Sequence, residues 1–121
     1  MTTTIEGIAL HHRHAEINGI RMHYAEAGEG ELVVLLHGFP EFWYSWRHQI
    51  AALAPHCRIV VPDQRGYNET DATGPYDTGT LQEDVIQLIE HLGERDAHIV
   101  GHDWGGAIAW LLAIEHPDRG R

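Results

Sequence analysis

The residues with the clearest chemical pattern form the segment Gly101–Gly106, which reads Gly-His-Asp-Trp-Gly-Gly and separates a short apolar run from an apolar helical stretch. Small residues two positions before and after one nucleophilic side chain are typical of a sharp strand-to-helix turn that lifts this side chain above a sheet. Glycine is needed at 101 and 105 because a Cβ atom would collide with nearby backbone. The nucleophile here is Asp103. Because an attacking carboxylate forms an ester with the carbon it attacks, the pattern favours opening or displacement at an alkyl carbon over acyl transfer.

Two further segments with chemically useful residues each follow a short apolar run that predicts a buried strand. One is His37-Gly38-Phe39-Pro40, and the other is Asp63-Gln64-Arg65-Gly66-Tyr67. Ligands of open α/β sheets bind at the carboxyl ends of the strands, so both loops are expected beside Asp103. Cleavage of an Asp103 ester needs two N–H donors for the oxygen that becomes negative. The pattern assigns these donors to the backbone of Trp104 and Phe39.

Several other polar or aromatic residues near these loops are predicted to be structural. They are expected to make structural hydrogen bonds, to organise their own loop or to pack in the core. This set is His37, His102, Asp63, Arg65, Trp43 and Trp46. The side chain of Trp104, beside the nucleophile, is instead predicted to line a substrate pocket.

The eleven histidines of the chain raise the question of a metal site. The densest group, His11, His12 and His14, falls in a predicted early strand. Alternation then places His12 and His14 on one face and His11 on the other. Since no cysteine or acidic cluster completes a ligand set, we expect no metal. We also expect no cofactor, because Asp103 interrupts the glycine pattern that a dinucleotide site would need.

Composition limits the class of protein. The chain has 121 residues, of which 43% are hydrophobic and 21% charged, so it forms one globular domain at most. A net charge of −10 argues against a nucleic-acid partner, because such binding depends on Lys and Arg. The longest apolar run, residues 32–36, is far too short to span a membrane, and no secretory signal is visible. A single cysteine, Cys57, excludes an internal disulfide and predicts a cytoplasmic location.

The elements that must position the chemistry alternate in type. Asn18-Gly19, between residues 14–17 and 20–26, predicts a hairpin with a two-residue turn. Apolar runs predict strands at 32–36, 58–61 and 98–100, and helical periodicity predicts helices over about 43–54, 80–92 and 105–115. Thr80 and Glu83 match a capping box at the start of the second helix, which ends at Gly93. The order predicts an α/β architecture: an N-terminal hairpin followed by parallel strands with right-handed crossover helices.

Three motifs in this order resemble those of the α/β-hydrolase-fold epoxide hydrolases. They are His37–Arg47, Asp63–Asn68 and Gly101–Gly106, and the resemblance extends from about Glu16 to the last residue. It implies an α/β-hydrolase fold truncated after the helix that follows Asp103. Residues 1–121 would then be the N-terminal part of a single domain, with the cap domain and the C-terminal part absent.

The resemblance also implies the reaction, which is the addition of water to a small apolar epoxide through an Asp103 ester. Phe39 and Trp104 would supply the oxyanion hole with their backbone N–H groups and line the substrate pocket with their side chains. In the family a Tyr pair on the cap, a His and its supporting acid follow the nucleophile in chain order. We therefore expect the full-length parent to be the enzyme and this chain alone to be inactive.

Two alternatives stay open. Haloalkane and haloacetate dehalogenases share the Asp nucleophile, but they tend to have Asn at the Phe39 position and Arg at the Trp104 position respectively, so the epoxide hydrolases fit better. The chain could also be a non-catalytic fragment or binding module. In a chain that stops at residue 121, strand 98–100 is expected to be an exposed apolar edge and helix 105–115 to lose its cover, which favours self-association.

Overall fold

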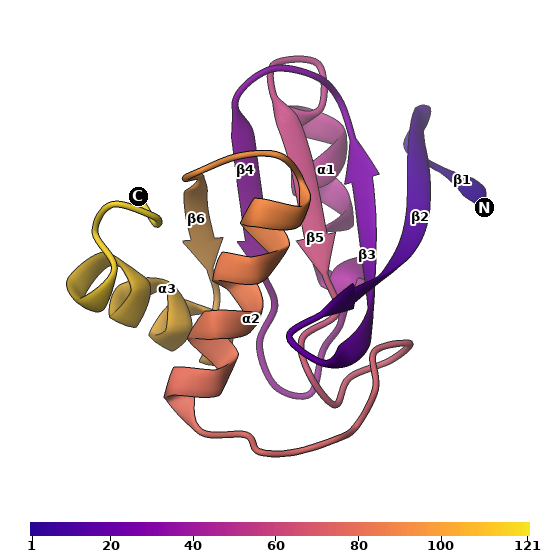
Figure 1. Ribbon diagram of the computed structural model, residues 1–121. Coiled ribbons are helices and arrows are strands. Elements are labelled where there is room, and N and C mark those ends of the chain that lie inside the picture. The colour runs from indigo at the N-terminus through magenta and orange to yellow at the C-terminus, as the bar shows by residue number, and fades with distance from the viewer.

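The computed structural model describes residues 1–121, whose strands form one mixed six-stranded sheet (Figure 1). The strands are β1 (Thr2–Ile5), β2 (Ile8–Ile17), β3 (Ile20–Ala27), β4 (Leu32–Leu36), β5 (Arg58–Pro62) and β6 (His98–Gly101). The helices are the 3₁₀ helix η1 (Trp43–Trp46), α1 (Arg47–Leu53), α2 (Thr78–His91) and α3 (Trp104–Glu115). The spatial order is β1-β2-β3-β5-β4-β6; β4 pairs in parallel with β5 and β6, and the other pairs are antiparallel.

The N-terminal hairpin confirms the turn prediction and extends it. Asn18 and Gly19 have φ values of 49° and 79°, as a two-residue turn with both central residues left-handed requires. A second turn of the same kind, Glu6-Gly7, with φ values of 48° and 84°, joins β1 to β2. Strand β1 was not predicted, because Thr-Thr-Thr-Ile carries no apolar alternation.

Alternating side chains of the strands divide the core into two layers. In β4, Val34 and Leu36 pack with α2 and α3, whereas Leu35 packs with α1 on the opposite face. In β5, Val60 lies in the first layer, and its neighbours lie in the second. The two faces of the sheet are therefore covered by different helices (Figure 1), as expected for strands that are apolar on both sides.

The helix boundaries differ in detail from the predicted ones. The helix predicted over about 43–54 begins as η1 and continues as α1, with Trp43 buried as a packing residue. The capping-box prediction at Thr80 was wrong, since α2 starts at Thr78 and its N-cap is Asp77, whose carboxylate accepts the Thr80 N–H. Asp77 precedes the apolar stripe by a full turn, so periodicity alone placed the start too late. None of the helices is long and apolar enough to cross a lipid bilayer.

The edge of the sheet at β6 is partly paired, whereas the sequence predicted an unpaired edge. Residues 119–121 run parallel to residues 97–99, with Ile99 donating to the Arg121 carbonyl at 2.7 Å and Arg121 donating back to the Ala97 carbonyl at 3.0 Å. The expectation of an unpaired strand 98–100 is thus wrong for its first half, while Val100 is exposed. The outer face of α3 is open as expected, with Trp110 73% exposed.

Candidate active site

The strands β4, β5 and β6 point the same way, so the three loops singled out in the sequence meet at one edge of the sheet, the lower one in Figure 1. At the end of β6 the chain turns sharply into α3 through Asp103, whose φ of 58° is in the left-handed region. A non-glycine residue held there costs about 1–3 kcal/mol, which the surrounding contacts must offset. A Cβ on Gly101 would lie 2.2 Å from the Gly105 carbonyl oxygen, and a Cβ on Gly105 would lie 2.1 Å from that of Leu36. The predicted need for both glycines is confirmed.

The carboxylate of Asp103 faces the loop that follows β4. The backbone N–H of Phe39 donates to Asp103 Oδ2 at 3.0 Å. Gly38 lies so close that a Cβ on it would be 2.5 Å from the Asp103 Cβ. Asp103 stands at the start of α3, but its side chain makes no capping hydrogen bond to that helix. The structure brings together the three residues predicted for the site: Asp103, Phe39 and Trp104.

Hydrogen bonding sets the charge of Asp103. Its pKa is held below the ordinary value, first by the Phe39 N–H and second by the Trp104 N–H; the nearby His102 contributes less. These groups stabilise the ionised form, so the side chain is a carboxylate at neutral pH. An exposed, ionised carboxylate with two backbone amides nearby has the composition of a nucleophile and its oxyanion hole.

The predicted structural role of His37 is confirmed. Its ring is buried, Nε2 accepts the Gln64 N–H at 2.9 Å, and Nδ1 bonds to the Gly38 carbonyl at 3.0 Å. Because Nε2 accepts, the proton of the neutral ring is on Nδ1. Burial lowers the pKa of His37, which keeps it neutral. His102, in contrast, is exposed, with Nδ1 3.5 Å from a Glu41 oxygen.

Asp63 and Arg65 organise their loop, as predicted, but through different partners. Arg65 forms a buried two-point ion pair with Asp84 of α2, at 2.9 and 2.8 Å. Asp63 instead binds His23 of β3 at 2.6 Å, and both side chains are fully buried. His23 was not among the residues predicted to organise this loop. The prediction that His12 and His14 share a face is confirmed, because both rings lie against the His23 ring, His12 stacked on it and His14 tilted to it.

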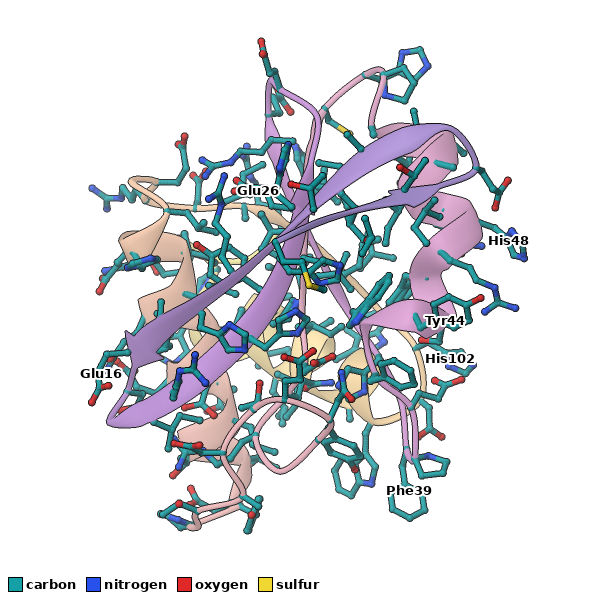
Figure 2. The ribbon with its side chains drawn as sticks, turned by 90° about the vertical axis from the view of Figure 1, so that its right-hand side faces the viewer. Glu16, Glu26, Phe39, Tyr44, His48 and His102 are labelled. Atoms are coloured by element: carbon teal, nitrogen blue, oxygen red, sulfur yellow. The ribbon has the colours of Figure 1, made fainter.

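A cavity of about 280 Å³ lies next to Asp103, lined by its neighbours Gly38 and Trp104 among other residues. Its lining is mostly aromatic and aliphatic: His37, Gly38, Gln64, Arg65, Tyr67, Tyr76, Leu81, Trp104 and Ile108. Trp104 therefore lines this cavity. The prediction that the Phe39 side chain lines the same pocket was wrong, because this side chain is outside the lining and projects from the lower edge of the molecule in Figure 2.

Tyr67 and Tyr76 are lining residues that the sequence analysis did not identify. Tyr67 lies in a motif that was noted, but Tyr76 lies in a polar loop with no pattern to mark it. Burial, followed by the charge of Asp103, raises the pKa of Tyr67, so its hydroxyl stays protonated at neutral pH.

Comparison with known proteins places this geometry in a family. Residues 31–119 match the family model described as alpha/beta hydrolase fold. The chain is 50% identical over 107 residues to an AB hydrolase superfamily protein of Bacillus subtilis, and 45% identical over 109 residues to a soluble epoxide hydrolase of Corynebacterium sp.. These alignments include 84% and 88% of this chain.

The crystal structure of an epoxide hydrolase from Vigna radiata superimposes on 91% of the chain, with a TM-score of 0.87 and 47% sequence identity. The chain spans 37% and 38% of the length of the two curated relatives and 36% of the Vigna protein.

Proposed function

The chain belongs to the α/β hydrolase fold family, and from this premise we propose that residues 1–121 are the nucleophile-bearing N-terminal part of the single hydrolase domain of an epoxide hydrolase. The observation that carries the proposal is the Asp103 carboxylate, held by a backbone amide at the end of β6. The identity to epoxide hydrolases of Corynebacterium and Vigna supports the substrate class.

We propose different roles for the two carboxylate oxygens of Asp103. Oδ2 is bound by the Phe39 N–H, so we assign the attack to Oδ1. A bond forms between Oδ1 and an epoxide carbon, the ring C–O bond breaks, and the ring oxygen leaves as an alkoxide that takes a proton from an acid. By the resemblance, that acid is a cap tyrosine of a longer parent chain; in residues 1–121 alone solvent water has to supply this proton, so ring opening is slower but still leads to the ester.

The second half of the reaction regenerates Asp103. A base takes a proton from a water molecule, whose oxygen attacks the carbonyl carbon of the ester, and negative charge develops on Oδ2 next to the N–H groups of Phe39 and Trp104. The bond from the carbonyl carbon to Oδ1 then breaks, Oδ1 takes the proton from the base and leaves with the diol, and Asp103 loses its remaining proton to become a carboxylate again. Water labelled with a heavy oxygen isotope should therefore leave label on Asp103 in the first turnover.

The chain by itself is proposed to stop at the ester. Deprotonation of the attacking water needs a base, and both ring nitrogens of His37 are engaged elsewhere. No hydrogen bond joins any histidine ring to Asp103 in the structure. In the family, the missing His and its acid lie beyond the nucleophile.

Intact-mass measurement tests the nucleophile directly. The 121-residue chain, incubated with styrene oxide, should gain the mass of one epoxide, with the adduct on Asp103. The Asp103→Ala chain should gain none. An equal adduct on both chains, or an adduct that maps to a surface histidine, would overturn the assignment. In the full-length hydrolase, Asp103→Ala should abolish turnover.

The dehalogenase alternative has less support. Phe39 offers only its backbone N–H at the site, with no side-chain amide to bind a leaving halide. Incubation with a haloalkane in place of the epoxide tests this alternative; rapid halide release without any epoxide adduct would favour it. The proposal is completed by a cytoplasmic location, for which the single free Cys57 is the support.

A further inference from the structure

The position of the Phe39 amide is set by something other than the packing of its own side chain. Phe39 is 64% exposed, and Pro40 beside it is exposed as well. Yet the amide meets Asp103 Oδ2 at 3.0 Å, across a segment that no regular element supports. The structure shows what holds the loop His37–Trp43 at its two ends.

The first end of the loop is fixed by Gln64. The Gln64 backbone N–H donates to His37 Nε2 at 2.9 Å, and its side-chain amide donates to the His37 carbonyl at 2.6 Å. His37 is only 1% exposed. Ring and backbone of the residue that opens the loop are thus both bound by one glutamine.

The second end of the loop, at Trp43, is fixed by Asp63, the residue before Gln64. The Trp43 backbone N–H donates to Asp63 Oδ1 at 2.9 Å, inside the protein. The carboxylate is fully buried, so this bond does not compete with water. Two consecutive residues at the end of β5 therefore hold both ends of a loop that follows β4.

Asp63 is itself held in place by buried groups. Its Oδ2 accepts from His23 Nδ1 at 2.6 Å and from Asn68 Nδ2 at 2.9 Å. His23 lies on β3, the strand on the other side of β5. Asp63 therefore connects the loop to the central strands of the sheet. These strands are the most rigid part of such a fold.

We propose that Asp63 and Gln64 are positioning residues, which clamp the loop His37–Trp43 so that the Phe39 amide faces Asp103 Oδ2. Neither residue bonds to Asp103. Each acts through the loop, and together they leave the amide little freedom to move away. The consequence for ester cleavage rests on the proposed function, whereas the clamp itself does not.

Hydrogen exchange at the Phe39 amide tests the clamp without any chemistry. In the Gln64→Leu chain, which loses the bond to the His37 carbonyl, this amide should exchange roughly fivefold faster at neutral pH, the effect of losing one hydrogen bond. The Asp103→Ala chain gives the rate of the unbound amide. The matched control is Gln87→Leu, because Gln87 is also half-buried and hydrogen-bonded, but to Asn18 and Glu83, away from the site.

A second variant keeps the test decisive if Gln64→Leu does not fold. Asn68→Gly removes one support of Asp63 and suits the backbone, because Asn68 has a φ of 46°. Faster Phe39 exchange in Gln64→Leu or Asn68→Gly, with Gln87→Leu unchanged, supports the clamp. Unchanged Phe39 exchange in every folded clamp variant overturns it, as does the same acceleration in the Gln87→Leu control.

A kinetic measurement in the full-length hydrolase separates the clamp from the proposed function. Gln64→Leu should slow cleavage of the Asp103 ester more than its formation, because charge develops on Oδ2 only in the cleavage step. If epoxides form no ester at all, the proposed function fails while the exchange result stands. If formation and cleavage slow equally, the clamp does not act through the Phe39 amide.

Discussion

Substitution of Gly38 by alanine is the sharpest test of the site geometry. A Cβ on Gly38 would lie 2.5 Å from the Asp103 Cβ, whereas ordinary contact begins at about 3.4 Å. The loop must therefore retreat by the difference, 3.4 − 2.5, or about 0.9 Å. Such a retreat lengthens the Phe39 N to Asp103 Oδ2 distance from 3.0 Å to about 3.9 Å, beyond hydrogen-bonding reach.

The expected loss of activity follows from the loss of one oxyanion donor, the Phe39 N–H. Removal of such a donor lowers turnover by about 10²–10³-fold, so the Gly38→Ala form of the full-length hydrolase should cleave the Asp103 ester that much more slowly. The assay is single-turnover ester decay followed by mass spectrometry. Overpacking should also destabilise the fold by about 1–3 kcal/mol, measured by urea unfolding.

The matched control is Gly106→Ala, three residues beyond the nucleophile. A Cβ there would meet its nearest neighbour, the Gly101 carbonyl oxygen, at 3.5 Å, an ordinary contact. Gly106 lies within α3, so alanine should be neutral or stabilising by up to about 1 kcal/mol. If the Gly38→Ala variant cleaves the ester as fast as the Gly106→Ala variant, ester cleavage does not depend on the close approach of the loop to Asp103.

Three further outcomes can be measured on the 121-residue chain. Arg65→Met should lower the free energy of unfolding by about 3–5 kcal/mol, because it leaves the Asp84 carboxylate buried without its cation. The double variant Arg65→Met, Asp84→Leu should recover much of this loss. A double variant as unstable as Arg65→Met alone would contradict the reasoning. Because the pKa of His37 is lowered in the folded state, its contribution to stability is complete above its ordinary value of 6.5 and is lost as the pH falls below that value. His37→Gln, which keeps an acceptor that does not titrate, should therefore lose less unfolding free energy between about pH 7.5 and about pH 5.5 than the unsubstituted chain, and equal losses would refute the role of His37. The exposed side chains of Trp110 and Ile114 on α3 should drive self-association, so replacing both with lysine should shift the chain toward monomer in analytical ultracentrifugation, and an unchanged distribution would exclude this surface.

Features that depend on a few neighbouring residues could be read from the sequence. Asn18-Gly19 predicted the hairpin because few other residues accept two left-handed φ values in succession. Gly101 and Gly105 predicted the turn at Asp103 because a Cβ at either position would collide with backbone. The Phe39 and Trp104 amides followed from the same pattern, since the turn fixes one and the preceding loop supplies the other. Local sterics leave such segments only one conformation.

The tertiary structure alone decided which distant segments meet. The strand order puts β5 between β3 and β4, and only this order brings Asp63 within reach of both His23 and Trp43. His23 and Asp63 are 40 residues apart, and no periodicity links them. The pairing of residues 119–121 beside β6 could not be predicted either, because the sequence Arg-Gly-Arg has no apolar or β-branched residue to indicate a strand. Local conformation is fixed by the sterics of neighbouring residues, whereas contacts between distant segments depend on how the whole sheet pairs, which no short stretch of this sequence encodes.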